Sequence, residues 1–158
     1  MLEFALVALP LSVMLFGILE VGLIFWGTYE LDNATLTAAR LIRTGQAQTS
    51  GTSQTGMITQ ICSQVFILPN CTSNLRLNVQ NFTDFAAVTS PTATGSNGSL
   101  LTSFPYQPGG PATVNLVTSF YEWPLVNFAG LSFLSNLSDG NRLLQSSAVF
   151  RTEPYPQI

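Results

Sequence analysis

The sequence has 158 residues, of which 46% are hydrophobic and only 8% are charged, so it forms one domain or a small domain with an appendage. The net charge of −3 excludes a nucleic-acid binder that works by neutralising phosphates. The absence of histidine removes the commonest metal ligand and the usual general base, so the composition favours a membrane-attached or assembly-forming protein over an enzyme.

Residues 4–27 are almost wholly apolar and predict a membrane-spanning helix that is retained in the mature protein. At 1.5 Å per residue this segment matches a hydrocarbon core of about 30 Å. Trp26 and Tyr29 lie near its end, where aromatic rings favour the lipid–water interface. A cleaved secretory signal is disfavoured because the apolar run is too long and no basic residue precedes it.

The helical pattern continues through residues 31–43, where apolar side chains recur at helical spacing, and Gly45 offers a C-cap. Two interpretations are open for this segment: a helix packed on its own domain, or a stalk whose apolar stripe packs on other helices. In both, we expect a transmembrane and stalk helix over residues 1–45 and an exported α+β head domain over residues 46–158.

The head is predicted to contain one helix and about three antiparallel strands. Residues 57–68 suggest a short helix ended by Pro69. Alternating or apolar runs predict strands over residues 75–80, 114–123 and 143–151, and the polar residues 90–111 predict a long surface loop. The fold class is therefore α+β, with a long N-terminal helix and a small globular head.

Cys62 and Cys71 are the two cysteines of the chain, nine positions apart. Two thiols without histidine make a poor zinc site, which requires four ligands. A disulfide that closes a short loop in an oxidising compartment is one interpretation, and two reduced thiols, one of them filling the core, is the other.

Glu20 lies inside the predicted membrane span, where an unpaired carboxylate costs at least a few kcal/mol. Gly17 and Gly27 share its helical face and allow another helix to approach closely. The span offers no cation, so we expect these three residues to act in helix packing, with a partner from another subunit. The alternative is a protonated glutamate bonded to a backbone carbonyl or placed near a water defect.

Glu3 stands at the start of the apolar run. A carboxylate there stabilises the helix N-terminus through the macrodipole. It can instead pair with the N-terminal amine of a neighbouring subunit and so fix the axial register of assembly.

The final predicted strand ends in Arg151 and Glu153, which share one face and are expected to anchor the chain end to the head. Glu122 is a candidate catalytic carboxylate, but Asp139 is the only candidate for the second acid or base that catalysis would need. Because the set of nucleophile, base and orienting group cannot be filled, we expect no catalytic, cofactor or metal site.

Both ends of the sequence resemble a known family. The opening LEFALVALPLSVMLFGILEVGLIFW, followed by LDNATLTAARLIRTGQ, resembles the TadE-like proteins of bacterial tight-adherence (Flp-type) pilus systems. The closing FYEWPLVNFAGLSFLSNLSDGNRLLQSSAVFRTEPY resembles the C-terminal half of the same family, whereas residues 50–110 carry no specific signature.

The resemblance implies a pseudopilin or minor pilin. The two glutamates of the family map onto Glu3 and Glu20, and its terminal arginine and glutamate map onto Arg151 and Glu153. In pilins an acidic residue follows the leader cleavage site at a fixed distance. Glu3 lies nearer than that distance to the first residue of this sequence. Either a leader precedes the printed sequence, or this member is not cleaved.

The implied partners are other pilin or pseudopilin subunits (a small major pilin and a second TadE-like protein), an inner-membrane assembly platform and a prepilin peptidase. The implied function is assembly of a surface pilus for adhesion, from a single span in the bacterial inner membrane. Arg40 and Arg43 follow the span and by the positive-inside rule place that side in the cytoplasm. The disulfide interpretation of the cysteines and the charge-poor head favour an exported head instead. The alternative function is an accessory single-span subunit of a stable membrane complex.

Overall fold

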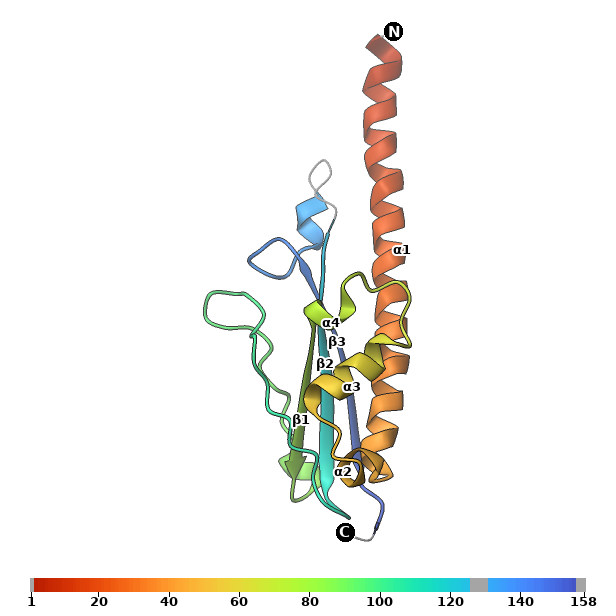
Figure 1. The fold of residues 1–158 in the computed structure, drawn as a ribbon. Helices are drawn as coiled ribbons and strands as arrows, with labels where there is room; N and C mark the ends of the chain where they lie inside the picture. Colours follow the sequence, from red (N-terminus) through yellow and green to blue (C-terminus); the bar gives the residue numbers. More distant parts are fainter. Residues whose placement is uncertain (1, 126–130, 156–158) are drawn as a thin grey trace.

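One long helix dominates the molecule and confirms the prediction of a continuous rod. The computed structural model describes residues 2–125 and 131–155. Helix α1 (Leu2–Arg43) extends well beyond the head at its N-terminal end and lies along the head over its second half (Figure 1). It ends where Gly45 adopts a left-handed conformation with φ of 77°, which a residue without Cβ adopts at little cost. The N–H of Gly45 then donates to the carbonyl of Ile42.

The head is built on a three-stranded antiparallel sheet of β1 (Leu75–Phe82), β2 (Val114–Trp123) and β3 (Arg142–Arg151), in the order β1-β2-β3. Leu75 pairs with Tyr121 in the first ladder, and Val114 pairs with Arg151 in the second. The α+β fold class predicted from the sequence is therefore confirmed, with the three strands close to their predicted positions.

The core lies between α1 and one face of the sheet. Residues opposite one another in the register point to the same face, so Leu77, Ser119 and their neighbours at every second position face the helix. The second half of α1 presents an apolar stripe to them, and the Thr35 hydroxyl lies 2.9 Å from Ser119 Oγ. The stripe is fully or almost fully buried; its members are Leu31, Ala34, Ala38 and Ile42. Residues 31–42 thus pack on the chain's own sheet, as the first of the two interpretations expected.

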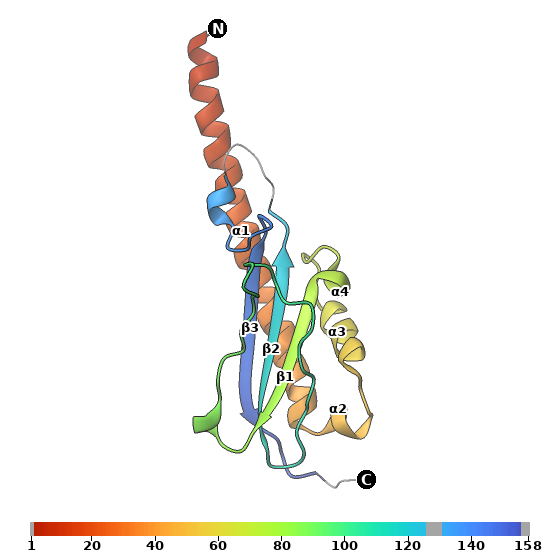
Figure 2. The same ribbon diagram turned by 90° about the vertical axis from the view of Figure 1, so that its left-hand side faces the viewer.

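The opposite face of the sheet is crossed by the long segment between β1 and β2 (Figure 2). This segment starts with the 3-10 helix η1 (Phe85–Ala87) and includes Phe104, whose ring stacks on that of Phe120 at 4.9 Å. Its residues 105–107 also bond to both backbone groups of Val79, which covers the outer edge of β1.

Three short helices connect α1 to the sheet: α2 (Gln46–Thr49), α3 (Gln54–Cys62) and α4 (Cys71–Asn74). A helix over residues 57–68 was expected, and its predicted end is wrong. Helix α3 begins earlier, where Ser53 Oγ accepts the N–H of Gly56, and it stops at Cys62. The following residues leave the helix because a side chain of α1 holds their backbone, as described below. A further 3-10 turn, η2 (Leu131–Leu134), lies between β2 and β3.

Candidate functional site

The N-terminal half of α1 is an apolar surface open to the surroundings. Its large side chains are half to four-fifths exposed; they include Phe4, Leu6, Val7, Leu9, Leu11, Met14, Leu15, Ile18 and Leu19. A soluble protein does not expose a continuous surface of this kind without something to cover it.

The length of this surface fits a bilayer. Glu20 is the first buried residue of the described helix, so the part before it measures about 27 Å at 1.5 Å per residue. The described chain contains one helix that is long and apolar enough to cross a membrane, within Leu6–Arg43. In the most apolar 18 residues of this helix, only 11% are buried. A core helix of a soluble protein would be mostly buried, so this helix is able to span a membrane and is consistent with a single-pass membrane protein.

Glu20 is held by the head of its own chain. It is 7% exposed, and its Oε1 accepts a hydrogen bond of 3.2 Å from Nε1 of Trp123, at the end of β2. A buried carboxylate needs such a donor because it has lost its water shell. The contact joins positions 103 residues apart and fixes the head against α1. The residue predicted to meet another subunit therefore has a partner within the chain, and its role in assembly stays a prediction.

The two glycines on the Glu20 face lie beside the head as well. A Cβ at Gly27 would lie 2.8 Å from Cζ3 of Trp123 and 3.3 Å from Cδ2 of Leu68. Gly27 thus permits the close approach expected of it, and the group that approaches is the Trp123 indole. Gly17 is half-buried and borders an apolar hollow that it shares with Phe133 of η2. The side chain of Glu3 lies outside the part of the chain that the structure describes.

Glu30 is a second carboxylate of α1 that positions the head. Its Oε2 accepts the backbone N–H groups of Phe66 at 2.8 Å and of Ile67 at 3.1 Å. These two donors would otherwise continue helix α3, which explains why the helix ends early. Two charge-assisted bonds tie the α3–α4 connection to the middle of α1.

A disulfide between Cys62 and Cys71 closes the same connection, with a Cα–Cα distance of 5.6 Å. It joins the end of α3 to the start of α4, next to the strand β1. The disulfide interpretation of the two cysteines is thus confirmed, and the structure contains no free cysteine.

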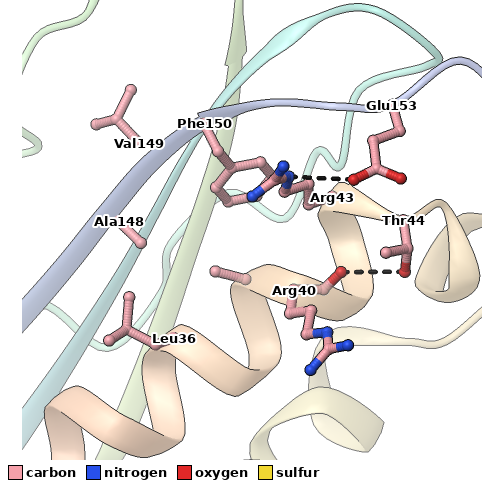
Figure 3. Close-up of a pocket in the computed structure, with 9 residues that line it drawn as sticks. Leu36, Arg40, Arg43, Thr44, Ala148, Val149, Phe150 and Glu153 are labelled. Carbon is pink, nitrogen blue, oxygen red and sulfur yellow. Dashed lines mark hydrogen bonds and ion pairs between the residues drawn. The ribbon is translucent and has the colours of Figure 1, made fainter.

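The C-terminal residues attach the chain end to α1 and to the β1–β2 segment. The Glu153 carboxylate pairs with Arg43 at 3.3 Å (Figure 3). The backbone N–H of Glu153 donates to the Arg43 carbonyl at 2.9 Å. Arg151 Nε donates to the carbonyl of Ala112 at 3.0 Å. Both side chains of the Arg43–Glu153 pair are more than half exposed, so the ion pair itself adds at most about 1 kcal/mol. The contacts agree with anchoring, which stays a prediction for Arg151 and Glu153.

Next to this pair, α1 and β3 border an open hollow of about 620 Å³. Leu36 and Val149 are exposed there, and the Arg40 side chain points away from the Arg43–Glu153 pair (Figure 3).

The two acidic residues weighed for catalysis do lie together. Asn141 Nδ2 donates to Glu122 Oε1 at 2.6 Å, and the Asn141 N–H donates to Asp139 Oδ1 at 3.1 Å. A hydrogen bond shared with Asp139 and partial burial raise the pKa of Glu122, and the same bond lowers the pKa of Asp139. Within the described residues no group of three or more acidic or cysteine side chains could hold a metal ion.

Sequence reasoning missed Trp123 and Glu30 as positioning residues. Trp123 ends an apolar strand and reads as an ordinary core residue, and Glu30 follows Tyr29 on the polar side of the interface. The available signal was chemical: a carboxylate in an apolar span requires a donor, and indole N–H groups are donors that apolar surroundings tolerate.

The N-terminal segment matches a known protein family. Residues 1–40 match the sequence model of the family described as TadE-like protein. This supports the resemblance predicted for the N-terminal segment, and the match does not extend to the resemblance in the C-terminal half. No curated protein and no solved structure matches the chain.

Proposed function

We propose that this chain is a TadE-like, membrane-anchored subunit that takes part in assembling a surface pilus for adhesion. The observation that carries the proposal is the exposed apolar half of α1, because that same segment matches the family. Its partners are other pilin or pseudopilin subunits and an inner-membrane assembly platform, and the head lies on the outer side of the membrane.

The mechanism is a change of surroundings for the exposed half of α1. In the bilayer its side chains contact acyl chains, and in a filament they contact helices of neighbouring subunits. Lipid tails are as apolar as leucine, so this exchange gains little from the hydrophobic effect. Packing and polar contacts must therefore favour the filament.

The contacts of Glu20 and Glu30 with the head matter for this mechanism because they fix the head on the rod before assembly. A subunit with a fixed head presents one defined shape to each neighbour. A head that rotated about α1 would lose conformational entropy on every addition.

Export of the head is supported by the Cys62–Cys71 disulfide, since disulfides persist in oxidising compartments. Arg40 and Arg43 argue for the opposite side when counted by the positive-inside rule. They lie on the part of α1 that packs on the sheet, and Arg43 is paired with Glu153, so they belong to the head and move with it.

A structural role also accounts for the acidic pair in the head. Asn141 bonds to both Glu122 and Asp139 and so closes the turn that leads into β3. We therefore propose that the protein is not an enzyme and requires no cofactor.

The proposal is tested by photocrosslinking in cells, with a benzophenone maleimide attached to a single introduced cysteine, so that the partner needs no thiol. Leu9→Cys places a thiol on the exposed part of α1, and Phe85→Cys places one on η1, at the far end of the head. Each introduced thiol is the only free one, because the native cysteines are bridged. We expect Leu9→Cys to give crosslinks to pilin subunits in surface filaments. We expect Phe85→Cys to give no such crosslinks, because η1 lies away from the helix contacts. Crosslinks from Leu9→Cys to a fixed multi-span complex alone would favour the alternative, an accessory subunit of that complex.

A further inference from the structure

The turn η2 lies beside the apolar half of α1, far from the polar end of the head. Phe133 in this turn is 75% exposed. Its side chain borders an apolar hollow of about 380 Å³ together with Val13, Gly17 and Val21 of the helix. In both ribbon views the light-blue turn η2 lies at the level of the upper half of α1 (Figures 1 and 2).

This position conflicts with a membrane that covers α1 alone. The apolar run reaches residue 27, but Phe133 of the head already borders a hollow that Val13 of the helix also lines. The overlap measures about 21 Å at 1.5 Å per residue, more than half the hydrocarbon thickness. A bilayer that surrounds the whole run must therefore also surround the tip of the head.

The polar groups of the head mark where the bilayer must end. Arg142 is the cation nearest to η2 along the chain, and its Nη1 donates to the Leu134 carbonyl at 2.8 Å. It borders a second hollow with Val21 and Thr28 of α1. Phe133, by contrast, borders a hollow whose lining is apolar on both sides. The change from apolar to charged surroundings thus falls near Val21.

We infer that the tip of the head, formed by η2 with Phe133, is a second membrane-contact site that inserts into the bilayer around α1. The occupant is the boundary between lipid headgroups and acyl chains, because the tip continues the surface of the membrane anchor itself. The centre of the Phe133 hollow, near Gly17, lies about 6 Å beyond Val21 along the helix. Apolar faces of interfacial elements are buried in lipid by about 5–10 Å.

This insertion gives the Glu20–Trp123 bond a defined environment. Trp123 is the register partner of Arg142 at the end of β2, and both Trp123 and Glu20 are buried. The head then covers the carboxylate at the depth where lipid would otherwise meet it. Two contacts, the helix and the tip, also fix the tilt of the head relative to the membrane.

The inference rests on the proposed membrane anchoring of α1, and one experiment separates the two. An environment-sensitive fluorophore is attached to single cysteines at Phe133, Leu9 and Phe85 in the full-length protein, reconstituted in phosphatidylcholine vesicles. Nitroxide-labelled lipids with the nitroxide near the headgroup or near the acyl-chain end report the depth. Phe85, at the far end of the head, is the matched control because it too is an exposed phenylalanine.

We expect the Leu9 label to be quenched by lipid nitroxides, the Phe133 label to be quenched more strongly by the headgroup-proximal nitroxide, and the Phe85 label to stay in water. A Phe133 label that behaves like the Phe85 label, while the Leu9 label is quenched, overturns the inference and leaves the anchor intact. A Leu9 label that also stays in water overturns both. Equal quenching at Phe133 and Phe85 overturns the inference too, because the contact would not be specific to the tip.

Discussion

Adding one methyl group at Gly27 tests whether Trp123 seats the head on α1. In Gly27→Ala the new Cβ would lie 2.8 Å from Cζ3 and 3.3 Å from Cε3 of Trp123. The indole is 5% exposed and bonded to Glu20, so it has little room to move. Gly22→Ala is the matched control, since nothing lies within 4 Å of its Cβ position in the same helix.

The two variants separate packing from helix propensity. Alanine in place of a helical glycine stabilises by about 1 kcal/mol, which both variants gain. Overpacking a filled site costs about 1–3 kcal/mol, which only Gly27→Ala incurs. We therefore expect Gly22→Ala to raise the free energy of unfolding by up to about 1 kcal/mol. The free energy of unfolding of Gly27→Ala should be lower than that of Gly22→Ala by about 1–3 kcal/mol.

The assay is denaturant unfolding in detergent, followed by the fluorescence of Trp123 in a Trp26→Phe background, so that one indole reports. Gly27→Ala should also shift the native emission of Trp123, whereas Gly22→Ala should not. Equal free energies and unchanged emission in the two variants would refute the close contact between Trp123 and α1.

Three further predictions concern the head. Glu20→Leu leaves the Trp123 N–H buried without an acceptor, so it should lower the free energy of unfolding by about 1–3 kcal/mol and abolish filament assembly while membrane insertion persists. Glu20→Gln keeps an acceptor and should lower the free energy of unfolding by less. Normal assembly of Glu20→Leu would contradict the role of Glu20 in assembly. Reduction of the disulfide should lower the unfolding free energy by about 2–3 kcal/mol, measured as a lower denaturant midpoint, and an unchanged midpoint would argue against it. Because the pKa of Glu122 is raised in the native state, the stability that Glu122 contributes is lost as the pH rises through that raised pKa. Because the pKa of Asp139 is lowered, the stability that Asp139 contributes is lost as the pH falls through that lowered pKa. Melting temperatures over an acid-to-neutral pH series should thus fall on both sides of the window between the two pKa values, and Glu122→Gln, which cannot ionise, should remove the fall on the neutral side.

The elements with strong local patterns could be predicted from the sequence. The apolar run and the helical spacing after it predict one long helix, and the alternation around Leu77 and the apolar residues of 114–123 predict strands. These signals suffice because each element buries a face that its own residues define.

The contacts that position the head could not be predicted in the same way. The early end of α3 depends on Glu30, whose carboxylate captures two N–H groups 36 and 37 residues later in the chain. The partner of Glu20 lies on a strand 103 residues away. Local periodicity predicts which face is buried, but it does not say which distant group meets a buried charge.

The central claim is that the exposed half of α1 holds this protein in a bilayer. Flotation of cell membranes in a sucrose gradient after an alkaline carbonate wash tests it most directly. We expect the full-length chain to float with the lipid and to be released only by detergent. A chain that stays at the bottom of the gradient as a soluble monomer without detergent would contradict the account.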